Sequence, residues 1–297
     1  MTGTTMTETA GATTRVSGRV GRIRRLPFPL VLGSILLALY IVVAVTGPLW
    51  APYSYDRVGT GKPFAPPSAK NLLGTDQMGR DLFSRVVYGA RHELLMALTA
   101  TAVAVIVGGF LGLLSGFVGG LYDEILMRIF EVLISIPVLV FALLVISAVG
   151  PEVSGSQLIL IGVVALVWLP RTGRMARAVA VDLVTRDYVM VARARGESAW
   201  SIVWRELLPN ATSVLLVEFG VRAGYAPILI GSLGFLGLGV RPPIPEWGLM
   251  ISENRANIVA APYTVLAPAL ALSGLVISLN LFTDGLARVL GRQVKRV

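Results

Sequence analysis

Long apolar runs restrict the fold of this chain more than any other feature of its sequence. A helix that crosses a lipid bilayer needs about 20 mostly apolar residues. Six segments meet this length: 29–49, 94–117, 125–149 with a kink expected at Pro137, one that begins near 157 and passes Trp168, 214–238 and 263–286. We therefore predict an all-α membrane protein with six transmembrane helices.

The composition agrees with lipid as the solvent around most of the chain. Hydrophobic residues make up 55% of the 297 residues and charged residues 14%, whereas soluble domains carry about 25% charged residues. The mean hydropathy is +0.74, which is too high for a fold surrounded by water. Because basic residues flank the apolar runs, we read the net charge of +9 as a topology signal and expect no nucleic-acid partner.

The positions of the basic residues predict the orientation. Six spans place both termini on one side of the membrane. Arginines precede the first span, basic residues end the chain, and the segment 171–205 between the fourth and fifth spans is also rich in arginine. The positive-inside rule makes this side cytoplasmic. The loop 51–93 then lies outside, although it holds six basic residues.

Glycines in the second span predict a close helix contact. Gly108, Gly112 and Gly116 recur every four residues and therefore lie near one face of the helix. Such small residues allow two transmembrane backbones to approach each other.

The polar segment 188–210 carries the densest pattern and is expected to form a helix, a turn and a second helix. Ala192 and Gly196 are four residues apart, so we expect a shared, nearly bare helix face that invites close packing. Four apolar residues then follow at the spacing of an amphipathic helix: Trp200, Val203, Trp204 and Leu207. Leu208, Pro209 and Asn210 are expected to end that helix. The residues alone leave two readings, a docking element for another protein or a helix lying on lipid headgroups.

Two charged groups stand out elsewhere. Glu218 and Arg222 lie four residues apart within the fifth span, where charge is costly and usually faces protein or water. They either pair structurally or line a path for a zwitterionic solute. Asp76 is a candidate N-cap for the helix that follows it, and Arg80, Asp81 and Arg85 are candidates for a fixed ion network.

Several chemistries are disfavoured by what the sequence lacks. It has no cysteine and a single histidine, so we expect no thiol catalysis and no metal site. It has no H-E-x-x-H motif and no phosphate-binding G-x-x-x-x-G-K-[ST] loop. We therefore expect no enzyme activity on this chain.

The segment 188–210 resembles the signature loop of ABC importer permeases, E-A-A-x3-G-x9-I-x-L-P. Ala192, Gly196, Leu208 and Pro209 match that pattern, whereas positions 190, 191 and 206 depart from it. Two further stretches, 73–85 and 234–248, resemble the C-type permease subunit of dipeptide and oligopeptide ABC importers. Together with the helix pattern, the resemblance extends from about Leu30 to Arg292.

The resemblance implies the type I ABC importer permease fold in a bacterial inner membrane. It divides the chain into a cytoplasmic tail (1–27), a first span with an extracytoplasmic loop (28–92), a permease core (93–288) and a second cytoplasmic tail (289–297). It implies that the segment 188–210 couples to a cytosolic ATPase, and the coupling residues it indicates are Ala192, Gly196, Trp200, Leu208 and Pro209. Glu218 and Arg222 become candidates for the translocation path, and Asp76, Arg80 and Asp81 for contact with a binding protein.

The resemblance also implies a set of partners. They are a second homologous permease in a heterodimer, two cytosolic ATPase subunits or domains, an extracytoplasmic peptide-binding protein and the lipid bilayer. ATP and Mg would be bound by the ATPase, so no cofactor is expected on this chain.

Two alternatives stay open at this point. Permeases of this branch also serve glutathione, nickel complexes or other non-peptide solutes. A self-sufficient secondary carrier or channel is the other class, and it would favour broken helices and an internal repeat. Purification with or without an ATPase separates these classes.

Overall fold

The computed structural model describes residues 27–150 and 155–294, with side chains described as far as residue 290. Regular structure within these residues is helical, apart from one isolated β-bridge between Thr75 and Asp81. The predicted N-terminal tail therefore lies outside the described residues, except for Pro27. The predicted C-terminal tail at 289–297 is helical as far as Val294.

Five helices are long and apolar enough to cross a membrane. They are α1 (Phe28–Trp50), α2 (Leu82–Val118), α5 (Gln157–Leu183), α8 (Leu208–Phe235) together with the short helical segments before it, and α10 (Tyr263–Val294). A sixth candidate is the bent pair α3 (Gly120–Ser135) and α4 (Val138–Val149). The all-helical membrane fold predicted from the apolar runs is thus confirmed, with five spans or six if the bent pair counts as one.

The third predicted span is broken rather than kinked. Ile136 leaves the helical conformation with φ −76° and ψ 131°, because the ring of the following Pro137 disfavours a helical residue before it. The axes of α3 and α4 consequently meet at 101°. The structure therefore has a full break between two helices at Pro137, where the sequence predicts a kink in one helix.

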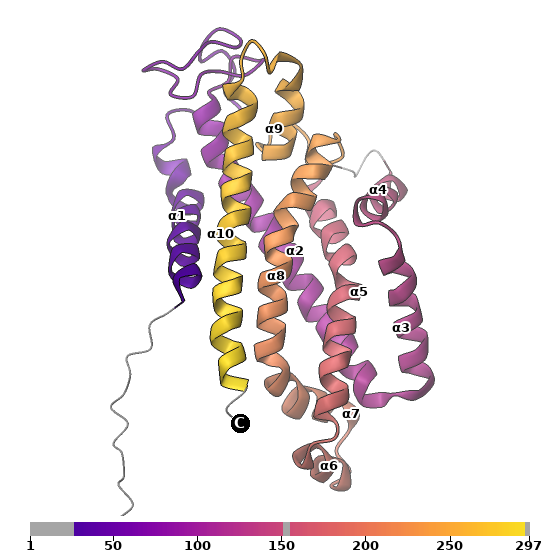
Figure 1. The fold of residues 1–297 in the computed structure, drawn as a ribbon. Helices are drawn as coiled ribbons and strands as arrows, with labels where there is room; N and C mark the ends of the chain where they lie inside the picture. Colours follow the sequence, from indigo (N-terminus) through magenta and orange to yellow (C-terminus); the bar gives the residue numbers. More distant parts are fainter. Residues whose placement is uncertain (1–26, 151–154, 295–297) are drawn as a thin grey trace, which may run out of the picture.

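The helices form an elongated bundle (Figure 1). α1 packs beside α10, α8 lies between α10 and α5, and α2 crosses the bundle to pack along α5. One end of the bundle carries the loop 51–81 and α9 (Trp247–Asn254). The opposite end carries α6 (Asp187–Ala194), α7 (Ala199–Ile202) and the end of α10 (Figure 1). We call this second end the loop end.

Glycines bring α2 and α5 together as the sequence predicts. A Cβ atom at Gly112 would collide with the carbonyl oxygen of Gly173, and one at Gly116 would meet the backbone of Arg177. A Cβ atom at Gly108 would likewise collide with the carbonyl oxygen of Leu169. The repeated glycines therefore allow direct backbone contact between the two helices.

Candidate functional site

The loop-end segment begins with α6, which ends in a glycine turn. Gly196 has φ +75°, its N–H donates to the Arg193 carbonyl at 3.0 Å, and the N–H of Glu197 donates to the Ala192 carbonyl at 3.2 Å. This is the Schellman arrangement, in which a left-handed residue closes the helix. Gly196 therefore lies beyond α6, and the expectation that it shares a helix face with Ala192 is wrong.

Ala192 packs inside its own chain. It belongs to a buried cluster in which α6 and the residues after it rest on the ends of α2 and α5: Leu113, Ala176, Ala180, Val189, Ala192, Ile202, Val203, Leu207, Ala211 and Leu215. The small side chain of Ala192 thus permits close packing, but the surface it meets is intramolecular. The segment is consequently fixed to three spanning helices by a continuous apolar core.

The chain continues without a break from α7 into α8. Ser198 caps α7 by accepting a hydrogen bond from the N–H of Ser201 at 3.2 Å, and a π-helical turn, Val203–Leu207, then leads directly into α8. Pro209 lies in the first turn of α8, so the prediction that it ends a helix is wrong. The wider turn makes room for the proline ring within a continuous helix, and the side chain of Asn210 donates to the Glu206 carbonyl at 2.6 Å.

Two tryptophans cover the outer surface of this segment. Trp200 is 59% exposed and Trp204 46% exposed, and their rings pack on Phe110 of α2 at centroid distances of 4.8 and 5.8 Å. Val203 and Leu207 point inward and are buried. The four residues therefore do not form the single apolar face expected from their spacing. We call Phe110, Trp200 and Trp204 the aromatic patch.

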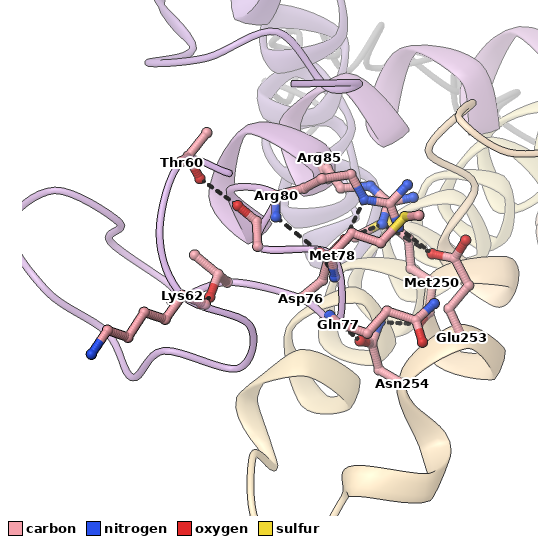
Figure 2. A network of polar contacts seen from close by, with 12 residues as sticks. Thr60, Lys62, Asp76, Gln77, Met78, Arg80, Arg85, Met250, Glu253 and Asn254 are labelled. Atoms are coloured by element: carbon pink, nitrogen blue, oxygen red, sulfur yellow. Dashed lines mark hydrogen bonds and ion pairs between the residues drawn. The ribbon is translucent and has the colours of Figure 1, made fainter. Parts of the chain in front are cut away.

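At the opposite end, Asp76 organises a buried ion network (Figure 2). Its Oδ2 lies 2.6 Å from both Arg80 Nε and Arg85 Nη1, and both arginines also reach Glu253 Oε2, at 2.9 and 3.0 Å. Asp76 Oδ1 accepts hydrogen bonds from the N–H groups of Met78 and Arg80. Glu253 was not singled out from the sequence, because its partners lie more than a hundred residues earlier.

The cap of α2 is Asp81 instead of Asp76. Its Oδ2 accepts a hydrogen bond from the Ser84 N–H at 2.8 Å, and its Oδ1 accepts one from Asn71 at 2.8 Å. Asp76, Arg80 and Asp81 are all buried. Their side chains hold the loop 51–81 in shape and, in this structure, are not available to touch another protein directly.

The second outer motif packs against the same region. Glu246 caps α9 by accepting hydrogen bonds from the N–H groups of Gly248 and Leu249 at 2.6 and 2.7 Å. Trp247 is buried, and its Nε1 donates to the Val86 carbonyl at 3.1 Å. Burial raises the pKa of Glu246 to about 7, since a charged carboxylate is disfavoured away from water.

Glu218 and Arg222 pair within α8 as expected, with Glu218 Oε1 2.6 Å from Arg222 Nη2. The Arg222 guanidinium also lies over the ring of Trp168, 5.4 Å from its centroid. Trp168 and Arg171, both from α5, were not predicted as members of this group. The pair itself agrees equally well with a structural role and with a transport role.

This fold defines a class: a multi-pass helical membrane protein whose polar segments lie at the two ends of its bundle. Residues 108–296 match the family model described as binding-protein-dependent transport system inner membrane component. The chain therefore belongs to that family. It is a multi-pass inner-membrane permease of a binding-protein-dependent ABC importer, and it is not itself an enzyme.

Individual relatives cover most of the chain. The dipeptide transport system permease protein DppC of Alkalihalophilus pseudofirmus is 34% identical over 89% of this chain and 86% of the relative. The glutathione transport system permease protein GsiD of Pectobacterium atrosepticum is 35% identical over 88% and 87%. The probable D,D-dipeptide transport system permease protein DdpC of Escherichia coli is 33% identical over 88% and 86%.

Proposed function

We propose that this chain is one of two homologous permease subunits in an ATP-driven importer of peptides, and that it forms half of the translocation path. Its relatives are named for the transport of dipeptides, di- and tripeptides and glutathione, which are all short peptides or peptide-like solutes. These names have a peptide or peptide-like substrate in common.

The observation that carries the proposal is the construction of the loop-end segment. Its inner face is buried among α2, α5 and α8, whereas its outer face exposes the aromatic patch. Exposed aromatic clusters of this kind are typical of protein interfaces. A partner that binds the patch would contact a segment that is rigidly packed against three spanning helices.

Each coupling residue then has a mechanical role. Ala192 lets α6 lie close to α2 and α5, and Gly196 supplies the left-handed turn that folds α7 back. Trp200 offers the contact surface, and Leu208 and Pro209 belong to the uninterrupted helical connection into α8. Movement of the docked partner would thus turn α8 as a rigid body. ATP and Mg would be bound by that partner, a cytosolic ATPase present in two copies or as two domains.

The orientation follows from the same proposal. The loop end would be cytoplasmic, and both chain termini would lie on that side. This is consistent with the end of α10, which lies at the same end of the bundle as α6 and α7 (Figure 1), and with the arginine-rich segment there. The loop 51–81 and α9 would face outward, where the surface that the Asp76 network holds in shape would receive the peptide-binding protein.

Purification and reconstitution test this function. The chain, purified from its native membrane, should co-purify with an ATPase and a second permease. In proteoliposomes, that assembly and a loaded binding protein should take up dialanine, trialanine or glutathione only when ATP is present. A nickel chelate serves as the non-peptide comparison. A chain that transports alone without ATP would instead be a secondary carrier.

A further inference from the structure

Two arginines lie within helices that are long and apolar enough to cross a membrane. Arg171 is near the middle of α5 (Gln157–Leu183) and Arg222 is near the middle of α8 (Leu208–Phe235). A charged side chain within a spanning helix is costly and is found facing protein or a water-filled path. The positions of the two arginines therefore indicate a protein partner or a functional role for their charges.

The two guanidinium groups share one aromatic ring. Arg171 and Arg222 lie over Trp168, 5.7 and 5.4 Å from its ring centroid. A cation over an aromatic face is stabilised by the ring's electrons. The ring thus holds two positive charges near each other, although like charges repel in a medium of low dielectric constant.

The acidic partners of this cluster do not balance its charge. Glu218 is paired with Arg222 at 2.6 Å. Arg171 donates to the backbone carbonyl of Val167 at 3.1 Å, and within the described residues it has no carboxylate partner. Two arginines and one glutamate leave one net positive charge at the middle of the bundle.

The cluster is open to its surroundings. The side chains of Arg222 and Glu218 are 18% and 10% exposed, and Arg171 is half-buried. The ring of Tyr225 lies 6.3 Å from that of Trp168, and Tyr225 is 48% exposed. The guanidinium groups are therefore not sealed inside this chain.

We propose that Trp168, Arg171, Glu218, Arg222 and Tyr225 form a binding site for the carboxylate of the transported solute. The inference rests on the proposed function, since it assigns the solute a free carboxylate such as a peptide C-terminus. Arg171 offers unpaired N–H groups in the planar geometry that carboxylates prefer. Glu218 orients Arg222 and limits its repulsion of Arg171, and the arriving carboxylate neutralises the remaining charge.

Binding measurements on the purified assembly in lipid nanodiscs, without binding protein, test the site independently of transport. The probes are dialanine and its C-terminal amide. The wild type should prefer dialanine, and Arg171→Gln should weaken dialanine binding by about tenfold or more while leaving the amide unchanged. Arg171→Lys should retain part of the preference. Arg128→Gln, which removes an exposed arginine of α3, is the matched control and should bind like the wild type.

A second variant separates recognition from simple structure. Glu218→Gln can still accept a hydrogen bond from Arg222 but increases the net positive charge, so it should bind dialanine at least as tightly as the wild type. Equal affinity of the wild type for dialanine and its amide would overturn the site, as would wild-type dialanine binding by Arg171→Gln or clearly weaker binding by Glu218→Gln. Failure of the proposed function would appear differently, as absent ATP-dependent uptake by a wild-type assembly that still prefers dialanine in the binding assay.

Discussion

Arg85 Nη1 lies 2.6 Å from Asp76 Oδ2, and both side chains are completely buried. Asp76 also holds Arg80, and Glu253 of α9 completes the network. The loop 51–81 is therefore joined to α9 by buried charges from distant parts of the chain. Such a network is sensitive to the loss of one partner, because the remaining charges stay buried without compensation.

Replacing Asp76 with Asn should consequently destabilise this end of the protein. The substitution leaves two buried arginines with only Glu253, at a cost of about 3–5 kcal/mol. Thermal unfolding of the purified protein in detergent measures the effect. Asp56→Asn, at an exposed position of the same loop, should unfold like the wild type. An Asp76→Asn variant that is as stable as this control would contradict the role of the network.

Replacing Gly112 with Ala should separate α2 from α5. The added methyl group would collide with the Gly173 carbonyl and approach the Ala176 side chain, and overpacking of this kind costs about 1–3 kcal/mol. Gly162→Ala in α5 is the control, since a Cβ atom there meets open space and alanine is the better helix former. Thermal unfolding should rank Gly112→Ala below the wild type and Gly162→Ala at or above it.

The turn at Gly196 offers a test of backbone geometry alone. Its φ of +75° is strained for a β-branched residue, although no atom lies near a Cβ atom there. Gly196→Val should therefore distort the turn and abolish ATP-dependent uptake, with the protein still inserted in the membrane. Gly196→Asn should keep much of the uptake, because asparagine tolerates the left-handed conformation. Equal uptake by the two variants would show that this turn is not needed for coupling.

Glu246 should make stability depend on pH. Burial raises its pKa from 4.5 to about 7, so the folded protein holds a proton that the unfolded chain releases. The stabilising contribution is complete below about pH 4.5 and is lost as the pH rises through about 7, at up to about 1.4 kcal/mol per pH unit. Thermal unfolding between these pH values should show the decline. Glu246→Gln should make the decline shallower, whereas Glu124→Gln at an exposed position should leave it unchanged.

The spans could be predicted because lipid imposes a length and an apolar composition that the sequence displays directly. The contacts of the loop-end segment could not be predicted in this way. Gly196 and the helical spacing of its neighbours indicate helix, turn and helix, but only Leu113 and Ala176, on other helices, decide that Ala192 is buried. Tryptophans with the same spacing as Val203 and Leu207 point outward because Phe110 offers them a surface.

Charged residues show the same limit. Asp76 and Asp81 both precede α2, and the sequence alone favours Asp76 as its cap. The role of Asp76 depends on Glu253, which lies 173 residues from Arg80. Glu253 and Asp76 bind the same two arginines in one network. Arg171 likewise looks like an isolated charge in an apolar helix until α8 brings Arg222 to the same Trp168 ring.

The most direct test of the account asks which end of the bundle touches the ATPase. The chain has no cysteine, so Trp200→Cys places a unique thiol in the aromatic patch, and Met78→Cys places one at an exposed position of the opposite end. Each variant is expressed with the ATPase and treated with a thiol-directed photo-crosslinker. Our account predicts that Trp200→Cys is crosslinked to the ATPase and Met78→Cys is not. Crosslinking of the ATPase from position 78, with none from position 200, would contradict it.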